Sequence, residues 1–91
     1  MLKLNLSKRS GKFLDKLPPK QFRQIDTKIK ALLIDPAPPD SSLLKGQASV
    51  YRRADIGEYR IVYRVNGDTL EVILIGKRND DEVHKALKRM L

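Results

Sequence analysis

Apolar and polar residues alternate through residues 50–78, and this period-two pattern predicts three consecutive antiparallel strands. The first two strands are expected at 50–56 and 59–65, on either side of Gly57. Asn66-Gly67 separates the second strand from the third, and this dipeptide readily adopts the positive φ angles of a type I′ turn. The segment is therefore expected to form two tight hairpins around which the rest of the chain packs.

Strand parity divides these residues between two faces. The apolar face is the expected core, and its members are Tyr59, Ile61, Tyr63, Val65, Leu70, Val72 and Leu74. The opposite face collects basic side chains: Arg53, Arg60 and Arg64, with Tyr51 nearby and with Lys77 and Arg78 where the third strand runs out after Gly76. A two-residue loop keeps Arg53 and Arg60 on one face, and a turn at Ile56-Gly57 would place them directly opposite each other.

Arginines that face each other across strands have a physical cost. Like charges in such pairs destabilise a sheet by roughly 0.2 to 1 kcal/mol per pair, and an anionic ligand would remove that penalty. The alternative interpretation is a solvated face of a basic protein. Clustering at one end of the sheet favours an anion-binding site.

The first half of the chain predicts a short strand followed by two helices. Leu2, Leu4 and Leu6 alternate with polar residues, and Ser7 is a candidate N-cap for a helix whose inward residues are Phe13, Leu14 and Leu17. Pro18-Pro19 ends this helix and suits the first turn of another, with an apolar stripe made of Phe22, Ile25, Ile29, Leu32 and Leu33. The helical hairpin is expected to cover the apolar face of the sheet.

Residues 35–40, DPAPPD, stop the second helix, and residues 41–46 form a connector into the sheet. Asn79, Asp80 or Asp81 can cap a final helix, whose apolar side is Val83, Ala86, Leu87 and Met90. The predicted fold class is α+β, with an N-terminal strand and helical hairpin packed on an antiparallel four-stranded sheet and a short C-terminal helix. Residues 1–91 are expected to form one domain.

Composition limits the possible functions. The 91 residues include no cysteine, have no apolar run close to a membrane span and show no signal-peptide hydrophobic region at the N-terminus, so we expect a soluble cytoplasmic protein without membrane contact. The net charge of +8 favours a polyanionic partner, with nucleic acid as the first candidate and an acidic protein as the alternative.

The chain offers little metal chemistry, and no cofactor is expected. One histidine without cysteine cannot form an ordinary zinc site, and the acids at 80–82 are better explained as a helix cap than as a Mg²⁺ site. Metal-free RNA cleavage remains, in which the 2′-OH attacks its own phosphodiester, arginines stabilise the phosphorane, and other groups transfer protons. His84 is the candidate for proton transfer because the unperturbed imidazole pKa is about 6.5, although a plain surface histidine is the alternative.

The sequence also resembles a known protein family. The segments YRRADIGEYRIVYRV and GKRNDDEVHKALKRML, and the DPAPPDSSLLKG connector, look like the RelE/ParE toxin superfamily, and in particular the RelE-type mRNA interferases of toxin-antitoxin pairs. The resemblance extends over essentially the whole chain. It implies a RelE-like fold, metal-independent cleavage of mRNA in the ribosomal A site, and neutralisation by a cognate antitoxin in a higher-order complex.

The resemblance also suggests site residues. Arg60, in the EYR segment, and Arg78, in GKR, resemble the phosphate-contacting arginines of the family, and Arg53 matches a further basic position. A second basic position falls on Tyr51 unless a one-residue shift brings in Arg52. His84 stands where several members carry tyrosine, and it is expected either to stack on a base or to transfer a proton. The predicted catalytic set is Arg53, Arg60, Arg78 and His84, with Lys45, Arg52, Arg64 and Lys77 as RNA-binding residues.

Two other functions remain open from the sequence. ParE-type members of the superfamily inhibit DNA gyrase and are not nucleases, and a nucleic-acid-binding module without catalysis would also explain the charge. The combined presence of Arg53, Arg60, Arg78 and His84 favours the nuclease. An acidic antitoxin, mRNA and the ribosome are the expected partners.

Overall fold

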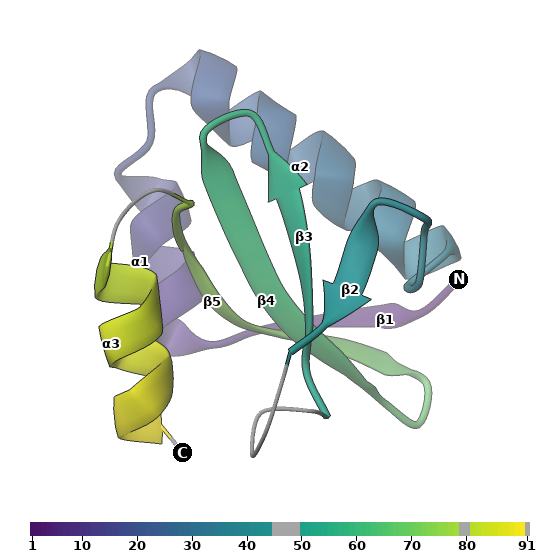
Figure 1. Ribbon diagram of the computed structural model, residues 1–91. Helices are drawn as coiled ribbons and strands as arrows, with labels where there is room; N and C mark the ends of the chain where they lie inside the picture. Colours follow the sequence, from purple (N-terminus) through teal and green to yellow (C-terminus); the bar gives the residue numbers. More distant parts are fainter. Residues whose placement is uncertain (45–49, 79–80, 91) are drawn as a thin grey trace.

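The structure, a computed structural model, describes residues 1–44, 50–78 and 81–90, and in the last segment it describes the side chains of 85–89. The elements in chain order are β1 (Lys3–Leu6), α1 (Lys8–Asp15), α2 (Pro19–Ile34), β2 (Ser41–Leu43), β3 (Arg52–Ile56), β4 (Tyr59–Asn66), β5 (Thr69–Lys77) and α3 (Asp81–Met90). The strands form one sheet in the order β1-β5-β4-β3-β2 (Figure 1). The predicted α+β class is confirmed.

The sheet differs from the expected one in two strands. Residues 41–43, expected to be part of a connector, pair with β3 as the short antiparallel strand β2. The N-terminal strand β1 pairs with β5 in parallel, so the sheet is mixed and has five strands. Three residues are too few to show a strand period, and the direction of β1 depends on a long-range pairing that no local pattern encodes.

Both predicted N-terminal helices form as their local signals indicate. The side chain of Ser7 accepts a hydrogen bond from the backbone N–H of Ser10, which is the geometry of an N-cap, and Pro19 occupies the first turn of α2. The two helices lie behind the sheet in Figure 1, whereas α3 lies in front of it. The helical hairpin therefore covers one face of the sheet, as the apolar stripes predict.

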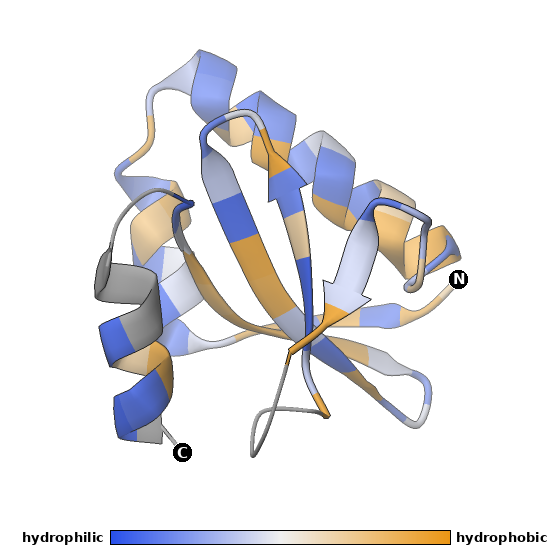
Figure 2. Ribbon diagram, in the orientation of Figure 1, coloured by the Kyte–Doolittle hydropathy of each residue, from blue (hydrophilic) through white to orange (hydrophobic). Residues whose placement is uncertain are grey.

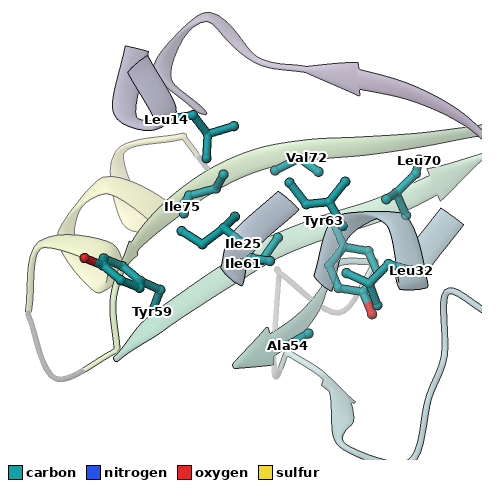
Figure 3. Close-up of a cluster of buried hydrophobic side chains, with 11 residues drawn as sticks. Leu14, Ile25, Leu32, Ala54, Tyr59, Ile61, Tyr63, Leu70, Val72 and Ile75 are labelled. Atoms are coloured by element: carbon teal, nitrogen blue, oxygen red, sulfur yellow. The ribbon is translucent and has the colours of Figure 1, made fainter. Parts of the chain in front are cut away.

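The main core lies between α1, α2 and the sheet. Figure 3 shows side chains of Leu14, Ile25 and Leu32 facing the strand residues of this core. Its buried members are Leu14, Ile25, Ile29, Leu32, Ala54, Tyr59, Ile61, Tyr63, Leu70, Val72 and Ile75. Two expected core residues are exposed instead: Phe22 near the start of α2 and Val65 near the end of β4. Both lie at the margin of the contact between helix and sheet, where apolar periodicity continues but no partner covers it.

The second hairpin turn lies one residue later than predicted, whereas the first lies between the two predicted strands, 50–56 and 59–65. Ile56 pairs with Tyr59 and Asn66 pairs with Thr69, so the loop residues are 57–58 and 67–68. Within the described chain only Gly57 and Gly67 have positive φ, so each turn has its glycine first, the pattern of a type II′ turn and not of type I′. The position of a two-residue turn does not change which residues share a face, but it decides which residues are partners across the strands.

A β-bulge in β5 changes which apolar residues face the main core. The register between β4 and β5 shifts at Val62 and Tyr63, so that Ile73 is the extra residue and Leu74 pairs with Val62. Because one extra residue reverses strand parity, Leu74 faces away from the main core, contrary to the prediction, and Ile75 takes its place.

A second, smaller core therefore forms on the other side of the sheet, under α3. Its buried residues are Val62, Leu74 and Ala86, and Leu44, Tyr51, Ile73 and Leu87 pack around them. Figure 2 shows hydrophilic bands between hydrophobic ones along β3 and β4. Strand alternation places the polar residues Arg53, Asp55, Arg60 and Arg64 on the same face as Val62, so this second face is only partly apolar. The remaining part of that face carries the arginines.

The start of α1 stabilises the bulge. The Ser7 hydroxyl donates to the carbonyl oxygen of Ile73 at 2.9 Å. The hydroxyl of the fully buried Ser10 donates to the carbonyl oxygen of Val72 at 3.3 Å. A bulge interrupts the hydrogen-bond ladder, and the Ser7 hydroxyl supplies a donor to the carbonyl of the extra residue, while the Val72 carbonyl also accepts from the backbone N–H of Ser7. The N-cap predicted from sequence thus also fixes where the sheet changes parity.

Candidate nucleic-acid interface

Arg60 on β4 forms a two-point ion pair with Asp55 on β3. Its Nε lies 2.8 Å from Asp55 Oδ1, and its Nη2 lies 3.3 Å from Oδ2. The arginine side chain is 15% exposed and the aspartate side chain is 33% exposed, so the ion pair is partly buried but still in contact with solvent. Bidentate pairing of this kind fixes the orientation of the guanidinium plane.

The position of the turn explains why Arg60 faces an aspartate. With loop residues 57–58, Asp55 stands directly opposite Arg60 and Arg53 opposite Val62, so the direct pairing of Arg53 with Arg60, expected only for a turn at Ile56-Gly57, does not form. Asp55 is a site residue that the sequence analysis missed. Its parity with Arg53 was visible in the sequence, but its position opposite Arg60 depends on the turn.

Arg53 and Arg78 lie near enough for their charges to act on the same carboxylate. Arg53 lies two residues before Asp55 on β3, and its Nε donates to Ser42 Oγ on β2 at 3.1 Å. Arg78 directly follows β5, and its backbone N–H donates to the carbonyl of Glu58 in the β3–β4 turn at 2.8 Å. The structure thus brings together three of the four predicted catalytic residues.

The pKa of Asp55 is lowered by the neighbouring arginines. The hydrogen bonds from Arg60 hold the pKa of the Asp55 carboxyl below its ordinary value. Partial burial acts in the opposite direction and raises this pKa, whereas the charges of Arg60, Arg53 and Arg78 lower it further. Asp55 is therefore ionised at neutral pH. Three arginines act on one carboxylate, of which Arg60 contacts it directly, so the site keeps an excess of positive charge. We call Arg53, Asp55, Arg60 and Arg78 the arginine cluster.

Arg64 shares a face with Arg60 but lies outside the arginine cluster. Its Nε is 2.6 Å from Glu71 Oε1, and its guanidinium lies 5.7 Å from the centre of the Tyr51 ring. The hydrogen bond and charge of Glu71 raise the pKa of Arg64 above its already high ordinary value. Four residues along a strand span about 13 Å, so Arg64 and Arg60 are separate sites.

The remaining predicted residues lie elsewhere or outside the described residues. Arg52 pairs across strands with Tyr63 and donates from Nε and Nη2 to Ser41 Oγ, so it lies on the opposite face from Arg53; the pairing of β3 with β4 contains no shift that would exchange them. Lys77 is exposed and, by strand alternation, shares the side of Tyr59. Lys45 falls outside the described residues, as does the side chain of His84, a residue of α3.

The arginine cluster has the chemistry of a phosphate-binding site. Guanidinium groups bind two phosphate oxygens at once and stay charged at every physiological pH. Among the described residues, neither Arg53 nor Arg78 forms an ion pair, so both charges can contact an anion. None of the helices in the described ranges is long and apolar enough to span a membrane.

A family model for the ParE toxin of the type II toxin-antitoxin system, parDE, matches residues 4–82. The chain belongs to this toxin family. The match covers the helical hairpin, the arginine cluster and the start of α3, and it confirms the predicted membership of the RelE/ParE superfamily. No curated protein sequence matches the toxin in a direct sequence comparison.

Solved structures of RelE and ParE proteins have the same fold. The toxin superposes on a chain of the archaeal RelE-RelB complex from Pyrococcus horikoshii OT3 with a TM-score of 0.74 at 25% identity, covering 86% of this chain and 96% of the other. For the YoeB/ParE toxin from Agrobacterium tumefaciens the TM-score is 0.72 at 28% identity, and the match covers 85% of this chain and 99% of the other. For the isolated RelE toxin of E. coli they are 0.61 and 27%, with 100% of both chains covered.

Proposed function

We propose that this toxin is a metal-independent endoribonuclease of the RelE type that cleaves mRNA in the ribosomal A site. The observation that carries the proposal is the arginine cluster, in which Arg53, Arg60 and Arg78 come from three different segments to one end of the sheet. A fold stabilised by burial alone has no need to concentrate three cations there, and the similarity to RelE structures supports the same activity.

In the proposed reaction, the ribose 2′-OH attacks the adjacent phosphorus and the P–O5′ bond breaks, leaving a 2′,3′-cyclic phosphate and a 5′-hydroxyl end. Arg60 and Arg78 stabilise the extra negative charge of the phosphorane, and Arg53 holds the neighbouring backbone. His84 is the candidate to transfer a proton to or from the reacting oxygens.

Gyrase inhibition is the second candidate, because the matching family description names the ParE toxin. Two assays on the same protein preparation separate the functions. Translating ribosomes are incubated with the toxin and the 5′ ends of the mRNA are mapped, while DNA gyrase is tested for supercoiling. New 5′ ends at A-site codons support the nuclease. Loss of supercoiling with intact mRNA would replace it with the gyrase function.

We further propose that the toxin acts in the cytoplasm and is neutralised by a cognate acidic antitoxin in a higher-order complex. Similar structures include complexes of RelE with RelB, and the +8 charge of this chain favours a negative partner. The antitoxin is expected to cover the arginine cluster and the segment 83–91. Hydrogen exchange of the complex should show protection there, and protection confined to the outer face of α2 would contradict the proposal.

The role of His84 remains a prediction with two outcomes. If its ring transfers a proton in the rate-limiting step, the cleavage rate should change with pH near the ordinary imidazole pKa of about 6.5, and His84→Phe should lose that dependence. If the ring only stacks on a base, His84→Phe should keep the wild-type rate at every pH. Single-turnover cleavage on programmed ribosomes, measured for wild type, His84→Phe and His84→Ala, distinguishes the two roles.

A further inference from the structure

The guanidinium of Arg60 is already occupied in the free toxin. Its Nε and Nη2 form one side of the planar fork, and both donate to the carboxylate of Asp55, at 2.8 and 3.3 Å. Carboxylate and phosphate present the same pair of oxygens to a guanidinium. A phosphate that takes this side of the fork must therefore displace Asp55.

The charges around Asp55 make such an exchange possible. The carboxylate is ionised at neutral pH, so it repels an incoming phosphate. Asp55 contacts Arg60 and also feels the charges of Arg53 and Arg78, and the last two form no ion pair within the described ranges. Asp55 thus reduces the mutual repulsion of the arginines while no ligand is bound.

Exposure also fits an exchange. With its side chain one third exposed, Asp55 can turn toward water when its partner leaves, whereas a fully buried carboxylate would be left without solvation. Arg64 and Glu71 form a comparable pair on the same face, but within the described part of the chain Glu71 forms an ion pair with Arg64 alone. Among the described residues, the combination of an ion pair, partial exposure and neighbouring arginines that form no ion pair is thus found at Asp55.

We propose that Asp55 is an intramolecular competitor for the phosphate-binding fork of Arg60, and that RNA binds by exchanging the Asp55–Arg60 ion pair for a phosphate–Arg60 pair. The proposal rests on the proposed RNA substrate but not on cleavage. Asp55 thereby lowers the affinity of the toxin for RNA and keeps the arginine cluster assembled before RNA arrives.

Binding of a short single-stranded RNA tests the competition. The probe is a fluorescent oligoribonucleotide with 2′-O-methyl groups, which cannot be cleaved by 2′-OH attack, and anisotropy gives its dissociation constant. Asp55→Asn keeps the shape and removes the charge, and it is expected to bind about tenfold more tightly than wild type. Asp68→Asn is the matched control, because Asp68 carries the same charge in the distant β4–β5 turn and is largely exposed beside Lys3. It is expected to change affinity by less than about threefold.

The Arg60 side-chain Nε–H signal in NMR provides a second measurement. In wild type this signal should shift on RNA saturation as its acceptor changes from carboxylate to phosphate, and in free Asp55→Asn it should already differ from wild type. Asp55→Ser also lacks the charge and replaces Asp55→Asn if the latter is unfolded by circular dichroism.

The outcomes separate this proposal from the proposed function. Tighter binding by the charge-removing variant, together with the shift of the Arg60 signal, supports competition even if ribosome assays detect no mRNA cleavage. If the charge-removing variant binds RNA with the same affinity as the Asp68→Asn control, or more weakly, the proposal is overturned. Asp55 is then an orienting residue that holds Arg60 for an end-on phosphate. Failure of both wild type and variant to bind the RNA also overturns it.

Discussion

Replacing Arg60 or Arg78 with alanine is expected to abolish growth arrest while leaving the toxin folded. By analogy with the removal of a donor from an oxyanion hole, loss of one transition-state phosphate contact should lower the cleavage rate on the order of 10² to 10³-fold. Arg78 follows β5 and is exposed, so its side chain supports no core packing. Single-turnover cleavage on programmed ribosomes measures the effect, with circular dichroism as the test of folding.

Arg64→Ala is the matched control for this prediction. Arg64 lies on the same strand and face as Arg60 and is also paired with a carboxylate, but it stands about 13 Å away. As a predicted RNA-binding residue outside the arginine cluster, Arg64 should cost less activity when replaced with alanine than Arg60 or Arg78 does. Because Arg60→Ala leaves Asp55 without its partner, the double variant Arg60→Ala/Asp55→Asn separates a loss of chemistry from a loss of stability. Full toxicity of folded Arg60→Ala and Arg78→Ala would show that the site lies elsewhere.

The largest expected effect on stability concerns α2. Leu32 is fully buried in the main core, and Leu32→Ala should lower the free energy of unfolding by about 2 to 5 kcal/mol because it leaves a cavity as well as removing apolar contacts. A domain of this size has only about 5 to 15 kcal/mol in total, so the variant should show a clearly lower urea midpoint.

Ile34, two residues further along the same helix, is 72% exposed and supplies the control. Ile34→Ala should change the free energy of unfolding by about 0.5 kcal/mol or less. Equal effects of the two substitutions would mean that α2 does not pack on the sheet through the face that contains Leu32.

Local patterns were sufficient where neighbouring residues decide the structure. Ser7 and Pro19 fixed the starts of α1 and α2, and the apolar spacing of α2 identified Ile25, Ile29 and Leu32 as core residues. Alternation along β3 and β4 placed Arg53 and Arg60 on one face. These features follow from capping and periodicity, which depend on residues a few positions apart.

The arginine cluster shows where local patterns end. A turn at 56–57 and a turn at 57–58 give the same strand faces, but the partner of Arg60 is Arg53 in the first case and Asp55 in the second. The structure has the second turn, so Arg60 forms an ion pair and not a like-charge contact. The residues of the turn do not distinguish a loop at 56–57 from a loop at 57–58, because Gly57 can take either position of a two-residue loop.

By itself, the sequence determined the α+β class, the helical hairpin, the basic face and the candidate arginines, because charge and periodicity are properties of the chain. Only the tertiary structure decided the parallel pairing of β1 with β5, the parity change at Ile73 and the meeting of Arg78 with Asp55 and Arg60. These three depend on contacts between segments far apart in the chain, and the free energy of such contacts is set by packing and register, which no short stretch of residues specifies.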